Sequence, residues 1–178
     1  STQGVSSAAS DVYKRQGNAE AISAENWQGK SYSAANKVNI ADYFEENTQY
    51  HYQYTDNYTG DDSVWSAEYD YTTKATDKFS VILTGDPQVG ASGSSSDKSA
   101  NDASVARDAY NWNKTMQQAL KTCPDASFLL SAGDQINQSG AAKDDDKKTR
   151  ESEYAGYLYP SVFRSLPIAA TIGNHDMA

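Results

Sequence analysis

The chain has 178 residues, of which 38% are hydrophobic and 22% are charged, so it can bury the core of one domain or of two small ones. Its formal net charge of −9 argues against a nucleic-acid-binding patch, which needs clustered Lys and Arg, and against docking on anionic lipid. No apolar run reaches the roughly 18 residues that a transmembrane helix needs. The single cysteine, Cys123, excludes a disulfide within the chain.

The N-terminal residues 1–18 are small, polar and aperiodic, which predicts a disordered end. Within this segment the run from Val5 to Gln16 resembles translated sequencing-adapter sequence. We therefore expect residues 1–18 to be non-native and leave them out of the fold prediction.

Residues 19–77 show a strand-like pattern. The run Tyr50–Asp56 alternates tyrosines with His, Gln and Thr, a period of two that is typical of a strand with one wet face. A second aromatic run, Ser63–Thr73, follows a segment of turn residues. Paired short strands of this kind favour an antiparallel β-sandwich.

In residues 78–178 apolar strands alternate with amphipathic helices. Nearly continuous apolar runs lie within residues 79–86, 127–134 and 166–176. Apolar residues at spacings of three and four between Val105 and Leu120 predict a helix that ends before Pro124. The segment Glu153–Ser165 predicts a second helix, which Pro160 breaks or restarts. The order β-α-β-α-β calls for parallel or mixed strands with helices on their faces.

Each of these three apolar runs ends in glycine followed by polar residues, in the motifs GDPQ (85–88), GDQ (133–135) and GNHD (173–176). Taken singly, a Gly-Asp pair is a common turn, whereas three such motifs in order, each closing an apolar run, are hard to obtain by chance. The carboxyl ends of parallel strands line one crevice. We therefore expect this edge to bring together Asp86, Gln88, Asp134, Asn174 and His175.

Together the motifs resemble the first three sequence blocks of the calcineurin-like metallophosphoesterases, and the resemblance covers Phe79 to Asp176. It implies that residues 78–178 are the first half of a four-layer αββα domain, truncated on its C-terminal side. Residues 19–77 resemble the closing strands of the partial fibronectin III-like domain found ahead of purple-acid-phosphatase-type catalytic domains. The implied reaction is metal-dependent hydrolysis of phosphomonoesters or phosphodiesters, on a small molecule or a phosphorylated substrate.

Carried over residue by residue, the resemblance implies that Asp86 binds the first metal and that Asp134 bridges both. Asn174 matches a ligand of the second metal. Gln88 stands where the family usually has histidine, although a GDPQ subgroup exists, and it is a further candidate ligand or close neighbour of the metals.

The same resemblance assigns the catalytic roles. His175 matches the histidine that contacts the substrate phosphate and protonates the leaving oxygen, and Asp176 matches its orienting partner. The family completes its site with further histidines, one alone and two in a His-x-His pair. This chain has only His51 and His175, and His51 lies in a predicted sandwich strand. We therefore expect the site to be incomplete here and the isolated chain to be inactive.

The metals follow from the ligand types. The ligands in this chain are all oxygen donors, which alone suggest Mg²⁺ or Ca²⁺. With the family's further histidines, two divalent or mixed-valence ions of Mn, Zn or Fe are favoured. No tyrosine matches the phenolate ligand of purple enzymes, which argues against a purple Fe(III) centre.

The alternative function is that of a cell-surface or secreted binding module, in which the second half is a degenerate phosphoesterase scaffold. Retention of Asp86, Asp134, Asn174 and His175 favours the enzyme, because a scaffold has no reason to keep them. The sandwich domain alone suggests a secreted, periplasmic or cell-surface location.

Overall fold

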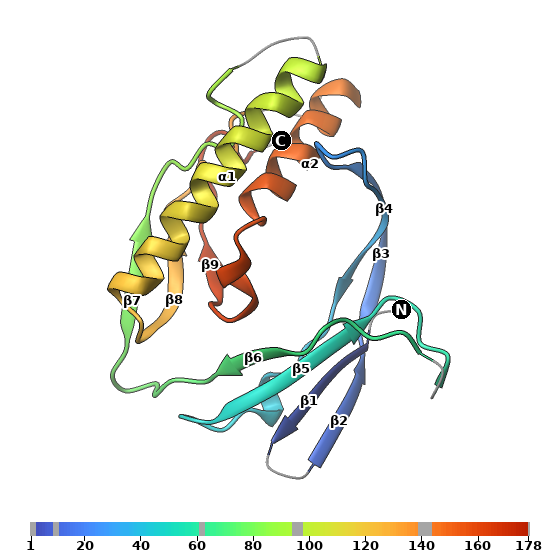
Figure 1. The fold of residues 1–178 in the computed structure, drawn as a ribbon, viewed down its shortest axis with the longest axis vertical. Helices are drawn as coiled ribbons and strands as arrows, with labels where there is room; N and C mark the ends of the chain where they lie inside the picture. Colours follow the sequence, from blue (N-terminus) through green and yellow to red (C-terminus); the bar gives the residue numbers. More distant parts are fainter. Residues whose placement is uncertain (1–2, 9–10, 61–62, 94–97, 139–143, 178) are drawn as a thin grey trace. The chain divides into compact units, whose positions relative to one another are not determined.

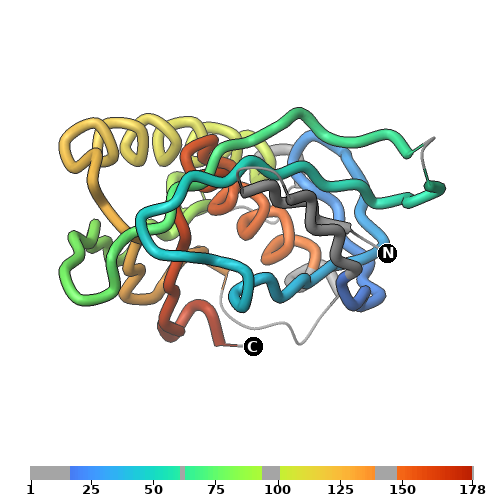
Figure 2. The backbone as a smooth tube through the Cα atoms, turned by 90° about the horizontal axis from the view of Figure 1, so that it is seen from below, coloured from blue at the N-terminus to red at the C-terminus, as the bar shows by residue number. Residues whose placement is uncertain are grey.

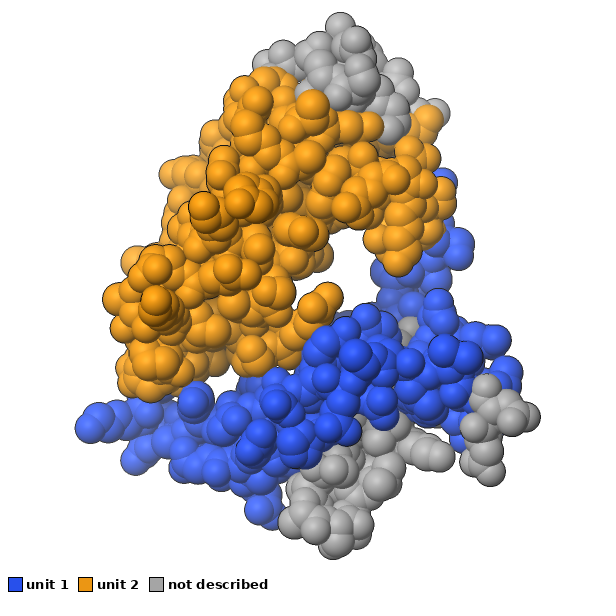
Figure 3. Space-filling view, in the orientation of Figure 1, with its two compact units in different colours: residues 1–23, 33–79 blue, residues 24–32, 80–178 orange. Residues whose placement is uncertain are grey.

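The computed structural model describes residues 3–8, 11–60, 63–93, 98–138 and 144–177, and the chain divides into two compact units. Unit 1 comprises residues 1–23 and 33–79, and unit 2 comprises residues 24–32 and 80–178 (Figure 3). The main boundary, between Phe79 and Ser80, lies close to the one expected between residues 77 and 78.

Unit 1 is built from antiparallel strand pairs, in a four-stranded sheet of order β2-β1-β5-β6 (Figure 1). Its strands are β1 (Gln3–Ala8), β2 (Asp11–Gln16), β5 (Gln49–Thr55) and β6 (Tyr69–Thr72). Two further strands, β3 (Asn18–Glu25) and β4 (Ser31–Lys37), pair with each other. The 3-10 turn η1 spans Ala41–Tyr43.

The strand predicted for residues 50–56 is confirmed as β5, but burial does not alternate along it, since Tyr50 and Thr55 are the two buried residues. Tyr50 is 2% exposed and Tyr54 is 47% exposed, although both lie on the same face of the strand. The difference arises because the ring of Phe44 covers Tyr50, at a centroid distance of 4.7 Å.

The N-terminal segment differs from the disorder expected of it. Within the described residues, 3–8 and 11–16 form β1 and β2, and β1 pairs with β5; residues 1, 2, 9 and 10 lie outside the described part. The physical reason is the free edge of β5 opposite β6, because an extended segment of almost any sequence can complete the backbone hydrogen bonds of an open edge.

Unit 2 contains a parallel three-stranded sheet of order β7-β8-β9, with helical crossovers between the strands. Its elements in chain order are β7 (Ser80–Thr84), α1 (Lys98–Thr122), β8 (Ala126–Ser131), α2 (Asp144–Tyr157), the 3-10 turn η3 (Ser161–Arg164) and β9 (Ile168–Ala170). The β-α-β-α-β order, the parallel pairing and the end of α1 before Pro124 are confirmed. The second helix begins earlier than expected, at Asp144, and Pro160 precedes the separate turn η3.

The main core of unit 2 lies between one face of the sheet and the crossovers. Ile82 and Leu129, 9% and 0% exposed, pack with Met116 of α1 and Leu166. Helices α1 and α2 lie side by side (Figure 1, Figure 2). At their contact the indole of Trp112 donates a hydrogen bond to a main-chain carbonyl of α2.

On the opposite face of the sheet, the expected burial of β7 is incomplete. The apolar run of β7 predicts burial on both faces, and for Leu83 this is wrong, because its side chain is 69% exposed. Leu83 is in register with Leu130 of β8, which in turn is in register with Ala169 of β9. The core cluster forms around Ile82 and Leu129, whose side chains point the other way.

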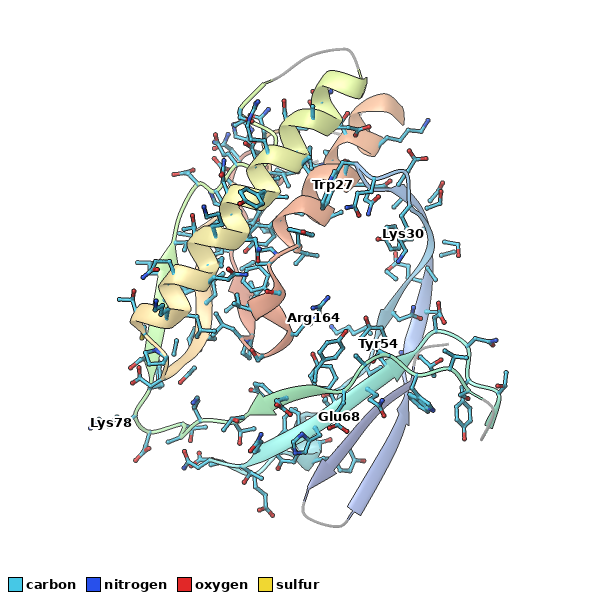
Figure 4. All side chains as sticks on the ribbon, viewed as in Figure 1. Trp27, Lys30, Tyr54, Glu68, Lys78 and Arg164 are labelled. Carbon is cyan, nitrogen blue, oxygen red and sulfur yellow. The ribbon has the colours of Figure 1, made fainter. Side chains whose placement is uncertain are left out.

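The turn between β3 and β4 belongs to unit 2. Asn26, 5% exposed, closes this turn by accepting hydrogen bonds from the backbone N–H groups of Gln28 and Lys30. Trp27 lies against α2 (Figure 4), where it packs on a small cluster centred on Val89 and Tyr157. None of the described helices has an apolar stretch long enough to cross a membrane.

Candidate functional site

Backbone pairing continues past the last residues of β7 and β8 into the polar loops that follow them. The Gln88 N–H donates to the Asp134 carbonyl oxygen at 2.9 Å, and the Asn137 N–H donates to the Val89 carbonyl oxygen at 3.1 Å. These bonds hold the two loops together at the carboxyl edge of the sheet, where the ligands were expected.

Three of the predicted ligands have an unusual backbone conformation. Asp86, Gln88 and Asp134 have φ angles of 48°, 36° and 49°, in the left-handed region that favours glycine. In the described part of the chain only one other non-glycine residue, Asn47, has positive φ. Such residues cost about 1–3 kcal/mol each and persist where the surrounding structure fixes them, which is typical of functional sites.

The loop after β9 crosses directly over Asp134. A side chain at Gly173 would overlap both the backbone nitrogen and the carboxylate of Asp134, so only glycine fits this crossing. The His175 N–H donates to Asp134 Oδ1 at 2.9 Å, and Gln88 Nε2 lies 3.4 Å from Asp134 Oδ2. The GDPQ, GDQ and GNHD motifs therefore meet at the Asp134 carboxylate, which is 8% exposed.

This environment keeps Asp134 ionised. The hydrogen bond from the His175 N–H is the largest cause that lowers the pKa of Asp134, and burial opposes it. The Gln88 amide, the charge of His175 and the Asp86 side chain lower the pKa further. At neutral pH the group is therefore an anion, which is the form that binds a cation.

His175 is oriented by a different partner from the one expected. Its Nδ1 is hydrogen-bonded to the backbone carbonyl of Asn137, and because a carbonyl only accepts, Nδ1 carries the proton. Asp176 instead shapes the loop, since its carboxylate accepts the N–H groups of Gln135 at 3.0 Å and Gly173 at 2.9 Å. Within the described residues, no hydrogen bond is found for the outer nitrogen, Nε2.

Two predicted ligands are more exposed than Asp134, although the Asp86 side chain is hydrogen-bonded to it. Asp86 and Asn174 are exposed, and within the described residues Asn174 makes no hydrogen bond to Asp134 or Gln88. The described part of the chain also holds no group of three or more His, Cys, Asp or Glu side chains arranged to bind a metal.

The donors at Asp134 nevertheless suit a hard divalent cation. Asp134 Oδ2 faces the Gln88 amide, whose oxygen and nitrogen exchange places by a half-turn, so a cation beside Oδ2 would meet two oxygen donors. One or two carboxylates with water completing the shell are a common arrangement for such ions.

Sequence reasoning missed two buried charged residues of α2. Arg150, 7% exposed, donates to the carbonyl oxygens of Gln138 and His175. Glu153, 3% exposed, accepts the N–H groups of Asn137 and Gln138, and burial raises its pKa to about 7. No sequence pattern distinguished these two residues, because a charged stretch has the same pattern whether its side chains are buried or exposed to solvent.

In comparisons with protein-family models, with curated proteins and with solved structures, no match to the chain was found. The family resemblance of the three motifs therefore stays a prediction.

Proposed function

We propose that this chain contributes Asp86, Gln88, Asp134 and Asn174 to a two-metal site that hydrolyses phosphomonoesters or phosphodiesters. The observation that carries the proposal is the Asp134 carboxylate, on which the three glycine-containing motifs converge. The left-handed backbone of Asp134 and the close crossing at Gly173 add support, because such conformations cluster at functional sites.

The cations, Asp134 and His175 would each have a separate role in the reaction. Bound cations would supply the positive field that a phosphate ester needs next to a protein of net charge −9, and they would acidify water in the site. Asp134 offers Oδ2 to the cations while its Oδ1 fixes the backbone of His175. Since Nδ1 of His175 is hydrogen-bonded to the Asn137 carbonyl, Nε2 is the ring atom from which a proton would pass to the leaving oxygen.

The resemblance implies further histidine ligands in addition to the residues named above. The chain has two histidines, and His51 lies on β5 in unit 1, with its ring bonded to Asp70 at 2.6 Å. With additional imidazole ligands, Mn, Zn or Fe are the metals we propose.

For unit 1 we propose the finer architecture of a fibronectin III-like sandwich domain. Its antiparallel pairs and the aromatic cluster of Phe44, Tyr50 and Tyr71 support this assignment. A secreted or cell-surface location belongs to the same proposal.

The test is Mn²⁺ binding by the 178-residue chain, followed by titration calorimetry. Asp134→Asn keeps the size of the side chain but removes its charge, and we expect at least about tenfold weaker binding, as for loss of a charged ligand. Asp70→Asn is the matched control, because it removes a carboxylate that is bonded to the other histidine.

Equal affinity in wild type and Asp134→Asn would refute the metal site and favour the binding-module alternative. Hydrolysis of p-nitrophenyl phosphate by the chain alone should be negligible. Robust turnover would show that the ligands in this chain suffice without further histidines.

A further inference from the structure

We propose that Arg150 and Glu153 of α2 are positioning residues that together keep His175 Nδ1 bonded to the Asn137 carbonyl and so fix the tautomer and orientation of the ring. This inference rests on the proposed function for its catalytic meaning, while the geometry that it describes can be tested without metal or substrate. The two residues are three apart on the helix and therefore lie on the same face.

Arg150 holds the backbone on the histidine side. Its guanidinium donates to the carbonyl oxygen of His175 at 2.8 Å, to that of Asp176 at 2.8 Å and to that of Gln138 at 2.9 Å. A planar fork with several donors suits this set of carbonyls, which a single ammonium group could not satisfy together. With these donors engaged and 7% of its surface exposed, Arg150 serves the loop rather than a substrate phosphate.

Glu153 holds the backbone that supplies the acceptor for the ring. Its Oε2 accepts the N–H of Asn137 at 3.1 Å and the N–H of Gln138 at 2.7 Å. The carbonyl of Asn137 is the acceptor for His175 Nδ1. Glu153 thus fixes the acceptor of the ring's hydrogen bond, and Arg150 fixes the backbone that carries the ring.

Gln138 ties the two contacts into one unit, because its carbonyl is bonded by Arg150 and its N–H by Glu153. Gly90 adds a third constraint, since a side chain there would overlap the Glu153 carboxylate. The loops after β7, β8 and β9 are therefore all held against one face of α2. Burial of two charged groups is costly, and they persist where they fix one arrangement of the polypeptide.

The experiment is long-range proton–nitrogen NMR of the imidazole rings in the metal-free chain, at about pH 8. The chain has two histidines, so the spectrum holds one signal set from His175 and one from His51, which serves as the internal reference. In wild type we expect His175 to carry its proton on Nδ1.

Arg150→Lys and Glu153→Ala should each change the His175 tautomer ratio by up to about tenfold, the factor that one hydrogen bond of ordinary net strength provides. Glu153→Gln should restore the wild-type spectrum, because its amide oxygen can accept the same two N–H groups. Arg107→Lys is the matched control, since Arg107 also bonds a loop carbonyl, that of Ser92, but does not contact the His175 loop.

Three results would overturn the proposal: a wild-type His175 protonated on Nε2, an unchanged tautomer in folded Arg150→Lys, or Arg107→Lys matching Arg150→Lys. If Glu153→Ala does not fold, the tautomer of the wild type and the tautomer ratio in Arg150→Lys still test the proposal. Because no metal is present, these outcomes are independent of Mn²⁺ binding, whose loss in Asp134→Asn tests the proposed function separately.

Discussion

Glu153 should make the stability of unit 2 depend on pH. Burial raises its pKa to about 7 from the ordinary 4.5, so the folded chain keeps this proton to higher pH than the unfolded chain does. The free energy of unfolding therefore falls as pH rises from about 4.5 to about 7 and is flat above that window. The difference between the two pKa values corresponds to about 3 kcal/mol, because one pKa unit is worth about 1.4 kcal/mol.

The variant Glu153→Gln tests this prediction, because glutamine keeps an acceptor for the N–H groups of Asn137 and Gln138 but cannot ionise. Urea unfolding at about pH 5 and about pH 8 should show a loss of about 3 kcal/mol in wild type, and most of that loss should disappear in the variant. Glu151→Gln on the same helix is the matched control and should keep the wild-type pH dependence. If Glu153→Gln loses as much stability as wild type over this pH range, Glu153 is not the cause of the pH dependence.

Three further predictions concern packing in unit 2. Leu129→Ala should lower the free energy of unfolding by about 2–5 kcal/mol in urea titrations, because Leu129 is 0% exposed, whereas Leu83→Ala should change it by less than about 0.5 kcal/mol. Trp27→Ala should cost about 2 kcal/mol in the same assay, since the half-buried indole covers an apolar cluster at α2. Gly173→Ala should both destabilise the fold by at least about 1–3 kcal/mol and weaken Mn²⁺ binding, since the new methyl group overlaps Asp134.

The sequence predicted the order of elements in unit 2 because each element has a strong local signal. The apolar runs and the helical spacing around Met116 follow directly from strand and helix geometry. Asp134 was expected at the carboxyl edge of the sheet because it follows directly after a predicted parallel strand. The period of two around Tyr50 likewise predicted β5.

What the sequence could not predict depends on three-dimensional neighbours. The acceptor for His175 is a backbone carbonyl at Asn137, and every residue type has such a group, so no pattern marks it. Burial of Arg150 and Glu153 depends on loops that are distant in sequence. The exposure of Leu83 was missed because an apolar run gives no information about which face of a sheet is covered.

The apolar row that runs from Leu83 through the partly buried Leu130 to Ala169 is exposed at both ends, which has a practical consequence for handling the protein. Apolar rows that face water bind hydrophobic dyes and promote concentration-dependent association of the folded chain. Melting curves recorded with such dyes should therefore start from a high signal before any unfolding occurs. The intrinsic fluorescence of Trp112, which lies between the two helices, reports loss of the fold without that background.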